Sequence, residues 1–304
     1  MKCLVTGGAG FIGSNLALEL EKQGHSVVVI DNLQTGNLKN LEGFQGEFIK
    51  GDVSKPMKIS KVDVIFHEAA ITDPRHPDDN ETYEKNINGF KEMIKLAQKI
   101  NAKLIYASTA SLYGNGKVPM QEDQKKEILS VYGKSKWEMD QMAQKLYSKM
   151  HIVGLRYFNV FGPREKFKNR AASMVYHLGK QMKQGGKPRL FKFGEQIRDH
   201  IYVKDVVDAT IKGLDAPSGV YNVGSGIGTS FNDLVLTINA VLKKKLEQEY
   251  FDMPYDPKTY QANTHADTTR AQMKLRFKSQ WSLKEGIADY FKFLDRMKWY
   301  NELD

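Results

Sequence analysis

The chain has one cysteine, nine prolines and no long apolar run among its 304 residues. A single cysteine, Cys3, cannot form an internal disulfide, and it excludes both a cysteine zinc cluster and a paired-thiol redox motif. No segment approaches the roughly 18 apolar residues that a membrane-spanning helix requires. The apolar stretch before the first glycine cluster is too short for the hydrophobic region of a signal peptide. These absences predict a cytoplasmic protein with no membrane partner.

Acidic residues are fewer than basic ones, 36 against 45, which gives a formal net charge of +9. A basic excess suits anionic ligands such as dinucleotides and nucleotide sugars, and it also suits nucleic acid. However, the lysines alternate with acidic residues, as in 39–47 and 91–99, and form no dense basic stripe. We therefore interpret the charge as a solvated, lysine-rich surface and expect no nucleic-acid partner.

Short apolar runs alternate with longer amphipathic stretches over the first 160 residues. The runs are rich in branched side chains and predict buried strands at 3–6, 26–30, 62–66, 103–107 and 152–156. The stretches have helical periodicity and predict helices at 11–23, 81–100 and 131–150. This alternation predicts an α/β fold, a Rossmann-like doubly wound parallel sheet with helices on both faces.

The pattern loosens after about residue 160, where glycines, prolines and aromatic residues become frequent. Helical patterns remain at 172–184, 231–244 and 283–296, and return strands are expected near 198–203 and 219–222. We therefore predict a first domain over 1–160, with return segments near 198–222. A smaller C-terminal α/β domain is expected mainly over 161–304.

A glycine-rich loop follows the first predicted strand and opens the first predicted helix. Gly8, Gly10 and Gly13 fit the spacing G-x-G-x-x-G, and Gly7, Gly10 and Gly13 fit G-x-x-G-x-x-G. Glycines allow a tight turn and a close approach to a pyrophosphate, while the helix N-terminus directs N–H groups at the phosphates. The loop therefore makes 1–160 a candidate NAD(P)-binding domain.

Asp31 ends the second predicted strand, where its carboxylate would accept hydrogen bonds from the adenosine ribose hydroxyls and so favour NAD. A turn or capping aspartate is the alternative. Asn32 and the basic Lys39 follow, and they leave NADP open as the cofactor. Asp52 and Val53 lie between the strands expected at 26–30 and 62–66, where they could read an adenine edge or form an ordinary turn.

Tyr132 and Lys136 begin the third predicted helix and project from one face, one turn apart. A phenol has a pKa of about 10, but a fixed ammonium nearby favours the phenolate. A phenolate can take a proton from a sugar hydroxyl as hydride leaves for nicotinamide. Thr109 ends the preceding strand, where its hydroxyl can orient the reacting oxygen. A surface Tyr–Lys pair is the alternative, and the order of these motifs along the chain favours catalysis.

These motifs resemble those of the extended short-chain dehydrogenase/reductases in order and spacing across nearly the whole chain. The matching segments are 6–13, 31–33, 67–70, 106–114 and 132–136. The resemblance implies a nucleotide-sugar substrate bound between two domains, with 161–304 mainly the substrate-binding domain, and a protein that forms homo-oligomers. It implies a catalytic triad of Thr109, Tyr132 and Lys136. It also implies contacts to NAD or NADP from Gly7, Gly10, Phe11, Ile12, Gly13, Asp31, Asn32, Lys39, Asp52, Val53, Ala69, Ala70, Asn86, Tyr132 and Lys136.

The second half resembles the ADP-glyceromanno-heptose 6-epimerases within this family, through 156–165, 172–178, 198–203 and 260–262. Those enzymes use a lysine after the first of these segments as a second acid/base, and the matching residue is Lys168. The resemblance implies transient oxidation to a ketone and reduction from its other face, where a different side chain handles the proton. It implies a substrate site of Thr109, Asn159, Lys168, His177, Arg198 and Tyr260.

Each of these residues also has a structural interpretation. Lys168 could be a solvated loop lysine, Arg198 a partner of Asp199, Asn159 a turn amide and Tyr260 a packed ring. The loop over 31–40 is closer to that of the NAD-using UDP-galactose 4-epimerases than to the NADP-binding loop of the heptose enzymes.

Three rival functions differ in the residues they need. A UDP-glucose/galactose 4-epimerase is the main alternative, because it uses the same Thr, Tyr and Lys but has no need of Lys168. A 4,6-dehydratase is disfavoured, because Ala110 and Ser111 stand where it needs an Asp-Glu pair. A non-catalytic NAD(P)-binding regulator is more distant, since both Tyr132 and Lys136 are present.

Overall fold

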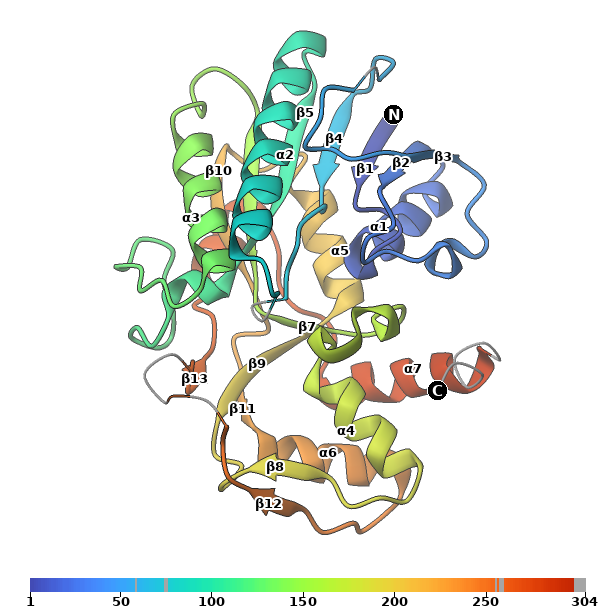
Figure 1. Ribbon diagram of the computed structural model, residues 1–304, viewed down its shortest axis with the longest axis vertical. Helices are drawn as coiled ribbons and strands as arrows, with labels where there is room; N and C mark the ends of the chain where they lie inside the picture. Colours follow the sequence, from blue (N-terminus) through green and yellow to red (C-terminus); the bar gives the residue numbers. More distant parts are fainter. Residues whose placement is uncertain (58, 74–75, 255, 257–259, 298–304) are drawn as a thin grey trace.

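Seven parallel strands form the central sheet, in the order β10-β6-β5-β4-β1-β2-β3 (Figure 1). The structure is a computed structural model that describes residues 1–304 except 58, 74–75, 255, 257–259 and 298–304. The strands are β1 Lys2–Thr6, β2 Ser26–Asp31, β3 Glu47–Lys50, β4 Val64–His67, β5 Lys103–Thr109, β6 Ile152–Tyr157 and β10 Gly219–Val223.

Helices cover both faces of this sheet. They are α1 Phe11–Lys22, α2 Asp79–Ile100, α3 Val131–Gln144 and α5 Val203–Lys212. Alternate side chains of each strand point to opposite faces. Val5 of β1 packs with α1 and α5, whereas Leu4 packs with α2 and α3. Every sheet pairing is parallel, so the predicted doubly wound α/β fold is confirmed.

A second lobe lies below the large sheet in Figure 1 and holds a separate apolar core. Its helices are α4 Met174–Lys183, α6 Phe231–Leu242 and α7 Leu283–Arg296. A two-stranded sheet pairs β8 Arg189–Phe191 with β12 Glu249–Phe251. The remaining short helical turns are η1 Leu38–Leu41, η2 Ala110–Tyr113, η3 Lys166–Ala171 and η4 Ala271–Leu275.

The strand expected near 198–203 is present, but it does not join the large sheet. It is β9 Ile197–Tyr202, which pairs with β7 Asn159–Phe161, β11 Gly228–Ser230 and β13 Asn263–Thr264. The place beside β6 is taken by β10 instead, which is the other expected return segment. Residues 203–212 form α5, which was not predicted, although Val203, Val206 and Val207 have helical spacing.

Two predicted helix boundaries shift for local reasons. The helix expected over 131–150 ends at Gln144, and turns occupy 145–149. The helix expected over 172–184 begins at Met174, because the Ser173 side chain accepts a hydrogen bond from the Tyr176 N–H and caps it. Within the described ranges, no helix combines the length and apolar composition that crossing a bilayer requires.

Candidate active site

A cavity of about 800 Å³ opens where the parallel strands end, between the large sheet and the second lobe. Ligands in open α/β sheets bind at this edge, because the loops after the strands converge there. Of the predicted site residues, only Lys39, on η1, does not line the cavity. The others all line it: Gly7, Gly10, Phe11, Ile12, Gly13, Asp31, Asn32, Asp52, Val53, Ala69, Ala70, Asn86, Thr109, Tyr132, Lys136, Asn159, Lys168, His177, Arg198 and Tyr260.

The glycine loop between β1 and α1 is tightly folded. Gly7 has a φ of +66°, and its carbonyl oxygen accepts a hydrogen bond from the Gly10 N–H at 3.0 Å. A Cβ on Gly13 would lie 2.3 Å from that same oxygen. No side chain caps α1 at Gly10, so the first-turn N–H groups remain for an anion. The loop therefore fits a pyrophosphate, which needs close backbone and free donors.

Asp31 holds the loop and lines the cavity at the same time. Its Oδ2 accepts a hydrogen bond from the Ala9 N–H at 3.0 Å, and its Oδ1 accepts one from the Leu33 N–H at 2.7 Å. Burial raises the pKa of Asp31, and these two hydrogen bonds lower it. A carboxylate oxygen can accept more than one hydrogen bond, so capacity remains for ribose hydroxyls.

Two further predicted cofactor contacts are engaged by the protein itself. Asp52 forms an ordinary turn, in which its Oδ1 accepts hydrogen bonds from the Ser54 N–H at 3.0 Å and the Ser54 hydroxyl at 2.7 Å. The Asn86 side chain accepts from the Ile71 N–H at 2.8 Å and donates to the Ile71 carbonyl and the Ser135 hydroxyl, both at 3.1 Å. Asn86 thereby fastens the segment after β4 to α3.

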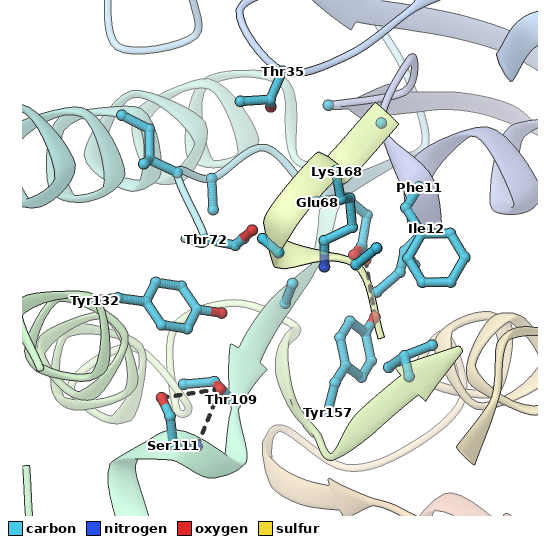
Figure 2. Close-up of a pocket in the computed structure, with 18 of the residues that line it drawn as sticks. Phe11, Ile12, Thr35, Glu68, Thr72, Thr109, Ser111, Tyr132, Tyr157 and Lys168 are labelled. Carbon is cyan, nitrogen blue, oxygen red and sulfur yellow. Dashed lines mark hydrogen bonds between the residues drawn. The ribbon is translucent and has the colours of Figure 1, made fainter. Parts of the chain in front are cut away.

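Thr109, Tyr132 and Lys136 converge from β5 and α3. The Ser130 side chain caps α3 by accepting a hydrogen bond from the Gly133 N–H at 3.1 Å, which fixes where Tyr132 leaves the helix. Figure 2 shows the Tyr132 ring extending into the cavity above Thr109. The Lys136 amine is 1% exposed and donates to the Ala107 carbonyl at 2.8 Å.

Burial governs the protonation of this group. It raises the pKa of Tyr132 to about 12; a hydrogen bond with Thr109 lowers that pKa and the Glu68 charge raises it. Burial lowers the pKa of Lys136 to about 8, while the charges of Glu68 and Asp140 raise it. At neutral pH Lys136 is therefore mainly an ammonium. Tyr132 is a phenol unless an added positive charge nearby lowers its pKa.

Lys168 approaches from the opposite wall. Its backbone N–H donates to the Glu165 carbonyl at 2.9 Å within η3, and its amine lies 5.7 Å from the centre of the Phe11 ring. Burial lowers its pKa, whereas the charges of Glu165 and Asp73 raise it. In Figure 2 the Lys168 amine and the Tyr132 hydroxyl point into the same space from opposite sides. Lys168 is thus a wall residue of the cavity.

Arg198 is 8% exposed and lacks a carboxylate partner among the described residues. Its Nη1 donates to two carbonyls, of Ile197 at 2.8 Å and Ala262 at 3.2 Å. The alternative partner, Asp199, is engaged elsewhere, because it accepts hydrogen bonds from 225, 226 and 266. A buried guanidinium without a counter-charge is a site for an anionic ligand.

Three other predicted sugar-side residues line the same cavity as Arg198. The Tyr260 ring centre lies 5.1 Å from its guanidinium carbon. Asn159 lies on β7, directly across from His200 of β9, and its Oδ1 accepts a hydrogen bond from the Thr264 hydroxyl at 3.4 Å. His177 lines the cavity from α4. The structure therefore places these polar groups on the second-lobe side of the cavity.

Several lining residues had no role assigned from the sequence. Glu68 follows β4 and bonds to Tyr157 of β6, at 2.9 Å between Oε1 and the hydroxyl oxygen. Ser111 donates its N–H to the Thr109 hydroxyl oxygen at 3.1 Å. His200 also lines the cavity; it lies in the segment 198–203 that carries the resemblance, but no role was assigned to it. In the described part of the chain, no three His, Cys, Asp or Glu side chains are grouped as metal ligands.

Comparisons with known proteins agree with this geometry. Residues 3–224 match the model of the NAD dependent epimerase/dehydratase family. An ADP-L-glycero-D-manno-heptose-6-epimerase of Brachyspira hyodysenteriae is 33% identical, over 98% of this chain and 99% of its own length.

Solved structures agree over the same length. The Helicobacter pylori ADP-L-glycero-D-manno-heptose-6-epimerase is 35% identical with a TM-score of 0.90, covering 97% of this chain and 96% of its own. The UDP-glucose 4-epimerase of Thermotoga maritima, solved with UDP-glucose, is 28% identical with a TM-score of 0.88, covering 97% and 99%. The chain belongs to the NAD dependent epimerase/dehydratase family.

Proposed function

We propose that the protein is an ADP-D-glycero-D-manno-heptose 6-epimerase that binds its nucleotide sugar in the 800 Å³ cavity. The observation that carries the proposal is the pairing of Tyr132 and Lys168 across one cavity. A reaction that inverts a carbinol carbon needs a proton-handling group on each face of the ketone. Relatives named as heptose 6-epimerases match nearly the full chain, which supports this choice of sugar.

We assign the dinucleotide to residues 1–160, together with β10, and the sugar mainly to 161–304. NAD fits the first region for two reasons. The glycine loop is folded so closely that a Cβ on Gly13 would fill the space where the turn at Gly7 meets α1, and the Asp31 carboxylate can accept further hydrogen bonds. The cofactor, when bound, supplies a hydride acceptor and a positive charge beside Tyr132. Arg198 holds the diphosphate of the substrate, where its guanidinium fork can engage two oxygens.

The proton chemistry follows from Tyr132 and Lys168, which lie on opposite walls of the cavity. Tyr132 takes the proton of the C6 hydroxyl, helped by the Lys136 ammonium, while the Thr109 hydroxyl orients that oxygen. The ketone then turns and presents its other face. Lys168 protonates the oxygen on that side, and its lowered pKa makes this proton easier to give.

A UDP-sugar 4-epimerase is the second candidate. It is favoured by the loop over 31–40, which lacks a lysine lining the cavity, and by the likeness to the Thermotoga maritima enzyme. The two candidates differ in the sugar carbon that is inverted. The purified protein, incubated separately with ADP-D-glycero-D-manno-heptose and UDP-galactose, is followed by NMR of the sugar protons.

Inversion at the heptose C6 is expected, with UDP-galactose unchanged. The variant Lys168→Met should lower the rate by about 10²- to 10⁴-fold, which is the usual loss of a general acid/base. The matched control Lys187→Met changes an exposed lysine outside the cavity and should keep the wild-type rate. Conversion of UDP-galactose alone would replace the proposal with a 4-epimerase.

A further inference from the structure

Glu68 is a carboxyl in the reaction cavity that the proposed mechanism does not use. It follows β4 and lines the cavity together with Tyr132 and Lys136 of α3. Figure 2 shows its carboxyl group reaching the Tyr157 hydroxyl, below Lys168. A partly buried carboxyl at the reacting end of a cavity influences every charge that forms there.

The hydrogen bonds around Glu68 can be counted. Three oxygen–oxygen contacts run in series: Glu68 to Tyr157 at 2.9 Å, Tyr157 to Thr210 at 2.8 Å, and Thr210 to the Val206 carbonyl at 2.7 Å. Each contact needs one hydrogen, a carbonyl supplies none, and the two hydroxyl groups supply one each. The third hydrogen has to come from Glu68. The full series therefore forms only when Glu68 is a carboxylic acid.

The charges that face Glu68 lie on three elements. From α3 come the Lys136 ammonium and the Tyr132 phenol, and from β6 comes the Tyr157 phenol. From η3 comes the Lys168 amine. The neighbouring His67 is buried and its pKa is lowered to about 3, so it adds no charge near neutral pH. Glu68 and Asp140 are the carboxyl groups whose charges raise the Lys136 pKa, and of these two Glu68 also raises the pKa of Tyr132.

The order of ionisation follows from burial. Burial raises the pKa of Glu68 to about 7, while a hydrogen bond donated by Tyr157 to the ionised carboxylate and the Lys136 charge lower it. Tyr132 ionises later, and an ionised Glu68 raises its pKa further. When Glu68 is neutral, it does not compete with the Tyr132 phenolate for the Lys136 ammonium. When Glu68 is ionised, its carboxylate competes for the same ammonium and repels the phenolate, which raises the pKa of Tyr132.

We propose that Glu68 is a positioning residue: its neutral acid form leaves the Lys136 charge to the Tyr132 oxygen, and its ionisation takes that support away. The proposal rests on the proposed function only in that Tyr132 is the base. Replacement of Glu68 by glutamine keeps the shape of the acid form and removes the competing charge. The variant Glu68→Gln should therefore ionise Tyr132 more readily than the wild type.

Phenolate absorbance of the NAD-saturated protein tests this directly. The signal of Tyr132 is the difference between each protein and the same protein carrying Tyr132→Phe. In Glu68→Gln the titration should move down by about one pH unit, so that about tenfold more phenolate is present at a given pH below the midpoint. The control Glu122→Gln changes a buried carboxyl beside Asn222 and should leave the titration unmoved. An unmoved titration in Glu68→Gln would overturn the proposal.

Infrared titration of the carboxyl band gives a second test that keeps Glu68. A carboxyl that titrates near neutral pH should be present in the wild type and absent in Glu68→Gln. No band of this kind would overturn the proposal. Neither titration needs a sugar, so a wrong choice of substrate would leave both results intact, whereas full activity of Tyr132→Phe would show that the proposed base is wrong.

Discussion

Gly13→Ala is the sharpest steric perturbation of the dinucleotide loop. The added Cβ would lie 2.3 Å from the Gly7 carbonyl oxygen and 2.9 Å from the Gly8 Cα, both backbone atoms. The first distance is about 1 Å short of an ordinary contact at 3.4 Å. A flexible side chain cannot relieve this clash, so either α1 or the turn has to move away. Overpacking of this kind costs about 1–3 kcal/mol.

The displaced atoms are those that fit the pyrophosphate, so binding should suffer as well as stability. We expect Gly13→Ala to weaken NAD binding at least about tenfold, because about 1.4 kcal/mol corresponds to one factor of ten. Calorimetric titration with NAD and denaturant unfolding measure the two effects. In the control Gly219→Ala the added Cβ meets the Tyr221 side chain, with the hydroxyl oxygen nearest at 3.4 Å, which is an ordinary contact, and it should change neither. Wild-type affinity in Gly13→Ala would refute the assignment of this loop to the pyrophosphate.

Three further predictions follow from single side chains. Arg198→Met should raise the KM for the nucleotide sugar about tenfold or more and leave the Kd of NAD unchanged, because only the diphosphate loses a partner. Arg156→Met should lower the free energy of unfolding by about 3–5 kcal/mol, because it leaves Asp140 buried without its partner at 2.9 Å. Glu68→Gln should gain stability relative to the wild type as pH rises from about 4.5 to about 7, since the folded state raises the Glu68 pKa and stability is lost as pH rises through it. Urea unfolding across that range measures the difference, and a constant difference would contradict the raised pKa.

The large sheet could be predicted because its signals are local. Buried parallel strands are short runs of branched residues, such as 26–30, and several of them, such as β1 and β4, are followed by a helix with apolar periodicity. Helix α5 was missed because it follows β9 without a turn residue between them: Tyr202 is both the last strand residue and the helix N-cap. The pairing of β9 with β7 could not be predicted from the sequence either, because it depends on which strand occupies the edge of the large sheet beside β6.

Cavity residues that belong to a local sequence motif could be predicted from the sequence. Those that reach the cavity only through contacts between distant parts of the chain could not. Tyr132 and Lys136 share a helix face through their spacing, so a sequence carries that relation. Glu68 and Tyr157 lie 89 positions apart and meet only because β4 and β6 flank β5 in the sheet. The engagement of Asp199 by 225, 226 and 266, which leaves Arg198 without a carboxylate, likewise depends on the folded second lobe.

Half-reactions of two variants test the opposed pair of Tyr132 and Lys168 most directly. Each variant, Tyr132→Phe and Lys168→Met, is saturated with NAD and mixed separately with each C6 epimer of the nucleotide heptose. The absorbance of reduced nicotinamide reports whether the epimer is oxidised. One epimer should be oxidised by Lys168→Met and the other by Tyr132→Phe, because each face of the ketone keeps one working group. Loss of oxidation of the same epimer in both variants would contradict the account.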